Sequence, residues 1–219
     1  MLPTLAELLG TTPGKSALYD FEQAIHVNVA QKLMDDAING RLAVDAIVTG
    51  RFIRELHWEL YGEIWTWAGA FRRHEINLGV APEQIPAETA SSLDTLIYRW
   101  RNTADWSSRQ IGISVHAEIL RIHPFADGNG RTSRLVADLV FLSTQDNDSV
   151  YLYEWRIDKP RYISLLREYD RHRNPRFLAE FIPIRSLVDK APGTKLRQHT
   201  RALYRPSAKT STAKLLIAT

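Results

Sequence analysis

The sequence contains no cysteine, so neither a disulfide bond nor a thiolate-ligated zinc site can stabilise the fold. No apolar run approaches the roughly 20 residues that a membrane-spanning helix requires, and we expect no membrane association. The first 16 residues, MLPTLAELLGTTPGKS, lack the basic start and long apolar stretch of a secretory signal. Together these absences predict a cytoplasmic protein.

The remaining composition is that of a globular domain. Hydrophobic residues make up 44% of the 219 residues and charged residues 24%, which suffices for one sizeable core. The net charge of +3 conceals an asymmetry, because residues 185–219 contain eight lysines and arginines against one acid. We therefore predict one domain over residues 1–184, with its core at about 17–182, and a basic, flexible tail over 185–219. Such a tail either stays solvated or binds nucleic acid or an acidic partner.

Apolar residues recur at helical spacing through most of the chain. Ile111, Val115, Ile119 and Ile122, for example, form one stripe that we expect to be buried. In contrast, the alternation in EINLGV (residues 75–80), with Gly79 at a turn, predicts a short β-hairpin. The fold class is therefore all-α with one small hairpin, and the expected helices cover 17–39, 43–61, 85–102, 108–122, 129–144, and segments starting near Asp158 and Pro175.

The segment HPFADGNGRTSR, from His123 to Arg134, combines residue types that suit phosphate chemistry. Gly128, Asn129 and Gly130 lead into a helix N-terminus, where unpaired N–H groups and the helix dipole attract anions. Arg131 and Arg134 are three residues apart, so both guanidinium groups start on one face of the first turn. Because guanidinium forks match phosphate oxygens, this arrangement indicates a polyphosphate ligand.

Two further residues of the segment have side chains suited to catalysis. The Asp127 carboxylate would repel a phosphate unless a cation lay between them, which favours Mg²⁺. His123 can accept the proton of an attacking hydroxyl group, because the pKa of an imidazole lies near neutral pH. Phe125 is expected to anchor the loop in the core. Each residue alone also has a purely structural interpretation, but their combination in this order favours a catalytic site.

The same residues resemble a known family. They match the Fic motif HxFx(D/E)GNGRxxR at all its defined positions, which are His123, Phe125, Asp127, Gly128, Asn129, Gly130, Arg131 and Arg134. Upstream, RELHWELYGEIWTWAGAFRRHEINLGV (residues 54–80) resembles the family's helix, tryptophan cluster and target-docking flap. The similarity covers about residues 17–182, and the order of the blocks is similar to the subgroup called mobile mystery protein B.

The resemblance implies a Fic-fold helical bundle with a hairpin flap, and a protein adenylyltransferase that moves AMP from ATP–Mg²⁺ to a hydroxyl group of a target protein. His123 would be the base and Asp127 the metal ligand, while the amides of Gly128, Asn129 and Gly130 would bind the anion. Arg131 would neutralise the leaving phosphates and Arg134 would hold the γ-phosphate. The flap residues that would grip the target are Ile76, Asn77, Leu78, Gly79 and Val80. In the Doc branch, a kinase, Ala-Asn-Lys replaces Gly-Asn-Gly, so this chain favours AMP transfer.

Many members of the family are inhibited by a glutamate in the motif (S/T)xxxE(G/N). No glutamate of this chain precedes a glycine or an asparagine, so that motif is absent. We therefore expect a separate partner to supply the glutamate, as in a toxin–antitoxin pair, although an enzyme without this restraint is an alternative. A catalytically silent scaffold or binding module, and a transferase of another donor such as a uridylyl or phosphocholine group, are also left open.

Overall fold

The computed structural model describes residues 15–145 and 150–187. This part of the chain is mostly helical, which confirms the predicted all-α class. None of its helices is both long and apolar enough to cross a membrane. Its elements are α2 (Lys15–Ile38), α3 (Val44–Ile47), α4 (Gly50–Tyr61), the 3₁₀ turn η1 (Pro82–Gln84), α5 (Ile85–Asn102), α6 (Ser108–Ile122), α7 (Asn129–Ser143), β1 (Tyr151–Tyr153), α8 (Lys159–His172), α9 (Arg176–Phe181) and β2 (Ile184–Ser186).

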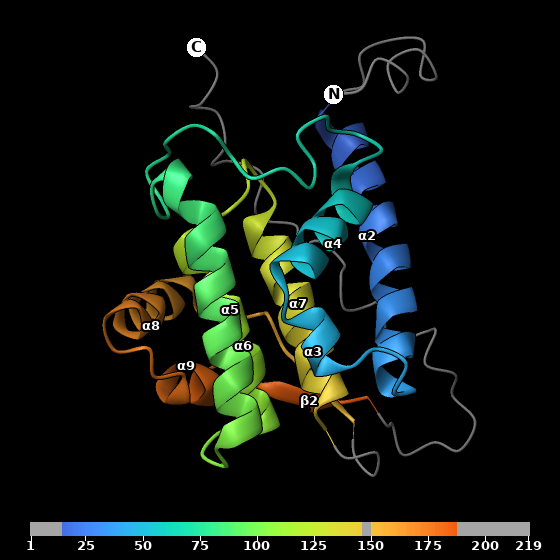
Figure 1. Cartoon of the computed structure of the whole chain (residues 1–219). Coiled ribbons are helices and arrows are strands. Elements are labelled where there is room, and N and C mark those ends of the chain that lie inside the picture. The colour runs from blue at the N-terminus through green and yellow to red at the C-terminus, as the bar shows by residue number, and fades with distance from the viewer. Residues whose placement is uncertain (1–14, 146–149, 188–219) are drawn as a thin grey trace, which may run out of the picture.

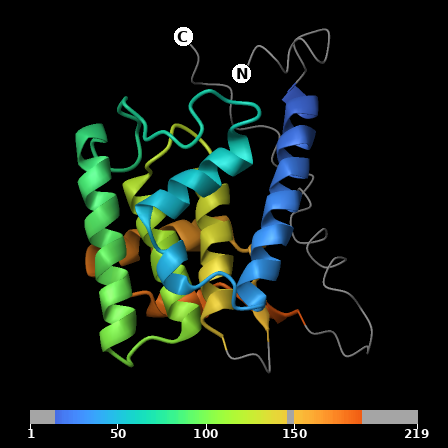
Figure 2. The same ribbon diagram turned by 45° about the vertical axis from the view of Figure 1, so that its right-hand side comes forward.

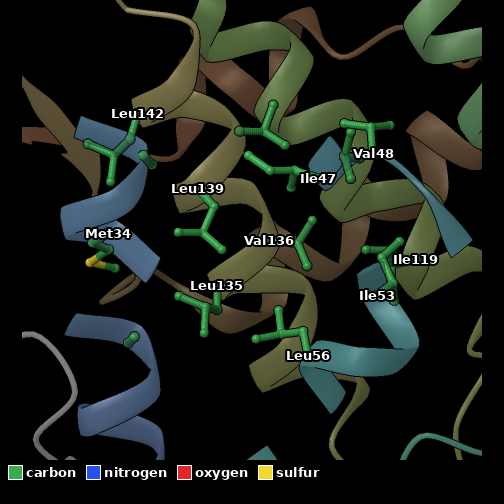
Figure 3. Close-up of a cluster of buried hydrophobic side chains, with 14 of the residues drawn as sticks. Met34, Ile47, Val48, Ile53, Leu56, Ile119, Leu135, Val136, Leu139 and Leu142 are labelled. Atoms are coloured by element: carbon green, nitrogen blue, oxygen red, sulfur yellow. The ribbon is translucent and has the colours of Figure 1, made fainter. Parts of the chain in front are cut away.

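Helix α7 is the centre of the bundle and contacts α2, α3, α4, α6 and β1 (Figures 1 and 2). Its side chains meet those of several other helices in the main core, as Figure 3 shows for Met34 of α2 and Ile119 of α6. The predicted stripe on α6 is buried as expected. The buried face of α7 consists mainly of Leu135, Val136, Leu139, Val140 and Leu142. The position of α7 fixes its N-terminus at one end of the bundle.

Several helix ends follow directly from capping chemistry. The side chain of Thr49 accepts a hydrogen bond from the Phe52 amide, and this cap divides the single helix expected over 43–61 into α3 and α4. Ser107 and Gln110 form a capping box at the start of α6. Asp158 caps α8, which begins where the sequence predicts a helix start.

The hairpin predicted over residues 75–80 is wrong, because these residues contain no strand. Within residues 15–145 and 150–187 the strands are β1 and β2, which pair antiparallel with Tyr151 opposite Ser186. We call residues 72–80 the flap segment; it lies within the connection that crosses the end of the bundle between α4 and α5 (Figure 1). A few of its polar backbone groups bind elsewhere: the Arg72 side chain donates to the carbonyl oxygens of His74 and Val80, and the Val80 N–H donates to Ile122 O. Residues 73–79 are exposed, so water can satisfy the remaining groups. No second strand is therefore needed to satisfy them.

The C-terminal limit of the described fold differs slightly from the predicted boundary at residue 184. Strand β2 continues to Ser186, and Leu187 is buried with its N–H bonded to Val150 O. The rest of the predicted basic tail, residues 188–219, lies outside the described residues.

Candidate active site

The segment predicted to bind phosphate forms the connection between α6 and α7. Helix α6 ends because His123 adopts a left-handed conformation (φ 52°, ψ 60°) and Pro124 follows it. Helix α7 begins after Gly128, which also has a positive φ of 78°. A Cβ at Gly128 would lie 2.6 Å from the Tyr61 ring, so both the backbone conformation and the available space require glycine there. We call residues 123–128 the motif loop.

The motif loop is held closed by a two-point contact between Asn129 and Phe125. The Phe125 N–H donates to Asn129 Oδ1 at 2.9 Å, and Asn129 Nδ2 donates to Phe125 O at 2.8 Å. Phe125 itself is fully buried. The structure thus confirms Phe125 as the anchor of the loop and gives Asn129 a structural task in addition to any contact with a ligand.

His57 of α4 supports the same loop and was not identified from the sequence. It is fully buried and stacks on Phe125, with 3.7 Å between ring centroids. Its Nδ1 accepts from the Gly69 N–H at 2.8 Å, so Nε2 carries the proton and donates to Asp127 O at 3.1 Å. Burial lowers the pKa of His57 to about 4, which keeps the ring neutral at neutral pH.

His123 has the protonation state that a general base needs. Its Nδ1 lies 3.4 Å from the Leu120 carbonyl oxygen, which can only accept, so Nδ1 carries the proton. Nε2 is then left with a lone pair. Burial, and to a smaller extent the charge of Arg72, lower the pKa of His123, so the ring is neutral near neutral pH. A neutral imidazole of this tautomer can accept a proton at Nε2.

The flap segment lies directly against His123. Arg72 Nε donates to His123 O at 2.8 Å, and a Cβ built at Gly79 would meet His123 Cβ at 2.6 Å. Further along the flap, the side chains of Ile76 and Leu78 are 37% and 63% exposed. The predicted flap residues and the predicted base are therefore brought together, although the flap is not a β-hairpin.

The N-terminus of α7 presents the backbone amides that the sequence predicts to bind an anion. The amides of Asn129 and Gly130 belong to its first two residues and so precede the intrahelical hydrogen bonds. The Gly128 N–H, in contrast, donates to the Asp127 carboxylate at 2.7 Å. Arg134 is exposed, with Nε donating to Gly130 O at 3.0 Å, and no described residue forms an ion pair with it. Its remaining N–H groups can therefore meet an anionic ligand.

Arg131 is held differently from Arg134. It forms an ion pair with Glu22 of α2, and its guanidinium group lies 4.8 Å from the centroid of the Tyr61 ring. The same Glu22 accepts a hydrogen bond from Trp65 Nε1 at 2.8 Å. The negative charge of Glu22 offsets the positive charge of Arg131. Glu22 is 109 positions away in the sequence, and no local pattern indicated this pairing.

The donor set near Asp127 suits a cation that also binds phosphate. No group of three or more histidine, aspartate or glutamate side chains in the described ranges could hold a metal by itself. Asp127 is exposed at the entrance to α7, where its carboxylate can provide one oxygen ligand. Mg²⁺ commonly binds proteins through one or two carboxylates and completes its shell with water and substrate phosphates. The residues present therefore fit a magnesium ion that arrives with a nucleotide.

Comparisons with known proteins agree with this geometry. The sequence model of the Fic/DOC family matches residues 47–141, from α3 through the motif loop and most of α7. The protein named protein adenylyltransferase Fic of Drosophila ananassae is 29% identical over 147 residues, which are 65% of this chain and 29% of that protein. The chain thus spans less than a third of the length of this relative.

Solved structures share the fold. A Fic domain-containing signalling protein from Bacteroides thetaiotaomicron superposes with a TM-score of 0.56 at 21% identity, covering 91% of this chain and 74% of that one. The BepC protein of Bartonella tribocorum, with bound AMPPNP, gives 0.55 at 15% identity and covers 78% of this chain and 89% of its own. The predicted bundle architecture is confirmed.

Proposed function

We propose that this chain, which resembles the Fic/DOC family over residues 47–141, is an adenylyltransferase that transfers AMP from ATP to a hydroxyl group of a target protein. The observation that carries the proposal is the state of His123. Its Nδ1 proton is engaged by Leu120 O, its Nε2 lone pair is left for a substrate, and its loop leads directly into the N-terminus of α7. A base therefore lies next to an anion-binding helix terminus.

In this reaction Nε2 of His123 takes the proton of a serine, threonine or tyrosine hydroxyl group. The hydroxyl oxygen forms a bond to the α-phosphorus, the bond to the β-phosphate bridge breaks, and pyrophosphate leaves. The amides of Asn129 and Gly130 and the guanidinium group of Arg134 stabilise the negative charge of the phosphates. Arg131 adds only the donors that Glu22 leaves free. A Mg²⁺ ion held by Asp127 and phosphate oxygens would supply further charge neutralisation.

We propose that the flap segment binds the target. The exposed side chains of Ile76 and Leu78 offer an apolar contact, and the backbone that follows them, at Gly79 and Val80, lies against His123 and Ile122. An extended target segment could add its main-chain hydrogen bonds along this stretch. Target choice would then depend on main-chain contacts together with these two apolar side chains.

Regulation and the nature of the donor are also proposals. Arg134 has no ion-pair partner among the described residues, which agrees with a separate inhibitor that supplies a glutamate, as in a toxin–antitoxin pair. The residues at the motif loop bind phosphates rather than a base, so a donor other than ATP is an alternative. A catalytically silent scaffold would need no neutral His123, whereas this chain keeps one. An acidic partner or nucleic acid would bind the basic tail.

The test is transfer of label to protein in a cell lysate, with Mg²⁺ and ATP labelled at the α- or the γ-phosphate. We expect the wild-type protein to transfer the α-label, and His123→Ala to lose the transfer. His172→Ala is the matched control, because this histidine is exposed at the end of α8. Transfer of the γ-label alone would identify a kinase. Transfer of neither label would refute the use of ATP, and labelled UTP or CDP-choline would then separate another donor from a silent scaffold.

A further inference from the structure

Arg72 is a buried cation with no carboxylate in ion-pair contact among the described residues, although the charge of Glu75 acts on it from a longer distance. Only 6% of its surface is exposed, yet it forms no ion pair with a described residue. Instead, each of its three side-chain nitrogens donates to a different carbonyl oxygen. Nε binds His123 O at 2.8 Å, Nη1 binds His74 O at 3.0 Å, and Nη2 binds Val80 O. The charge is thus stabilised by three backbone dipoles.

These three carbonyl groups come from two segments far apart in the sequence. His74 and Val80 belong to the flap segment, whereas His123 is the proposed base, 51 positions from Arg72. Two backbone hydrogen bonds also join these segments: the Arg72 N–H donates to Pro124 O at 2.9 Å, and the Val80 N–H donates to Ile122 O at 3.2 Å. Arg72 therefore joins both sides of the flap segment to the motif loop.

Gly79 shows independently how close the flap is to the base. It has a φ of 89°, and an added Cβ would meet both His123 Cβ and Ile122 O at 2.6 Å. The flap backbone consequently packs on the histidine without an intervening side chain. A shift of the flap by an ångström would alter its distance from the imidazole directly.

We propose that Arg72 is a positioning residue that fixes the flap segment against His123, so that a hydroxyl group on a flap-bound target meets Nε2 in a constant geometry. This inference rests on the proposed function, because it assumes that a target docks on the flap. The planar guanidinium group donates in three fixed directions, whereas a lysine ammonium is a single point that cannot reach three separated carbonyl oxygens equally well. The side chain itself contacts neither the acceptor hydroxyl nor the phosphates.

The inference predicts which steps depend on Arg72. Nucleotide binding uses the start of α7 and Arg134, which Arg72 does not contact. Transfer to a target depends on the distance between the flap and His123, and a misplacement of about 1 Å can cost about a hundredfold in rate. We therefore expect Arg72→Gln to reduce kcat/KM for the protein target by about 10- to 100-fold, with Arg72→Lys in between and the Kd for ATP unchanged in both.

The experiment first measures amide hydrogen exchange in the full chain. In Arg72→Lys and Arg72→Gln we expect the Val80 amide to exchange about tenfold faster or more, since a charge-assisted hydrogen bond beside it is lost. Amides within α6 and α7 should keep their protection, which shows that the fold is intact. Arg54→Lys is the matched control: Arg54 Nε also donates to a backbone oxygen near the flap, Gly69 O at 2.9 Å, but no bond joins it to the motif loop.

Two further measurements complete the test: the kinetics of label transfer from ATP to the target protein, and the Kd for ATP from a binding titration. Unchanged Val80 exchange in both Arg72 variants would refute the coupling, and unchanged kcat/KM despite faster exchange would refute the positioning role. An equal loss of ATP affinity and transfer would also refute it, because that pattern indicates general damage to the site. If the wild-type protein transfers no nucleotide, the proposed function fails, and the exchange data alone decide whether Arg72 fixes the flap to His123.

Discussion

Acid should destabilise this fold strongly between pH 6.5 and pH 4, because three histidines are buried in the neutral form. His57 and His116 are fully buried and His26 is 4% exposed. Burial is the main cause that lowers the pKa of His26 and His116 to about 3 and that of His57 to about 4. Nearby arginine charges add to the effect, Arg131 and Arg134 for His26 and Arg134 for His116.

The direction of the effect follows from proton binding. An unfolded histidine binds its proton at about pH 6.5, whereas these three bind it in the folded state only near pH 3–4. In the window between, the unfolded chain holds more protons, so the free energy of unfolding falls as the pH falls. Integrated from pH 7 to pH 5, each histidine contributes a loss of at most about 2 kcal/mol. Three such losses approach the whole stability of a typical domain, about 5–15 kcal/mol.

Urea denaturation at pH 7, 6 and 5 measures this dependence. We expect the wild-type protein to lose stability steeply, and His57→Asn to lose about 2 kcal/mol less over the same range because one such site is gone. Its stability at pH 7 will be lower, but the dependence on pH is the readout. His172→Asn, which changes an exposed histidine, should follow the wild-type curve. The same pH dependence in His57→Asn and wild type would refute the assignment of His57 as a neutral buried group.

Two substitutions test local contacts. Gly79→Ala should displace the flap from His123, because the methyl group would lie 2.6 Å from His123 Cβ, and we expect target labelling to fall about tenfold. Gly40→Ala is its control, since Gly40 also has a positive φ (69°) but an added Cβ there would meet nothing within 4 Å; equal losses in both would point to backbone strain alone. Glu22→Gln should lower the free energy of unfolding by about 1–2 kcal/mol, because its partly buried ion pair with α7 becomes a neutral hydrogen bond. In calorimetry, Glu55→Gln should have no measurable effect, because that pair is exposed. An unchanged melting temperature in Glu22→Gln would contradict the first of these two expectations.

The helices and the motif loop could be predicted because their determinants are local. The stripe on α6, the cap at Asp158 and the glycines before α7 each act within a few residues, so sequence spacing identifies them. The Phe125 anchor also follows from its place in the loop. The roles proposed for His123 and Asp127 stay predictions, although their positions at the ends of the motif loop agree with them.

The flap could not be predicted correctly for the opposite reason. The alternation in residues 75–80 is compatible with a strand, but a strand also requires a partner for its backbone groups. Here the backbone groups of Val80 bond instead to the Arg72 guanidinium group and to the Ile122 carbonyl oxygen, and Ile122 is 42 positions from Val80. The support of His57 for Asp127 likewise joins residues 70 positions apart. Such pairings depend on the tertiary fold, and one sequence offers no spacing rule for them.

The two arginines of the motif show how the difference between local sequence spacing and tertiary contacts affects phosphate binding. Their spacing places both on one face of the first two turns of α7, yet only tertiary contacts decide how much of their charge a phosphate can use. Arg131 is matched by Glu22 and packed on Tyr61, so binding a phosphate there must compete with an existing ion pair. Arg134 is exposed and without an ion pair in the described chain, so its charge is the less compensated of the two. A polyphosphate approaching the start of α7 should therefore gain most from Arg134, and an acidic group from another protein would compete with it at the same position.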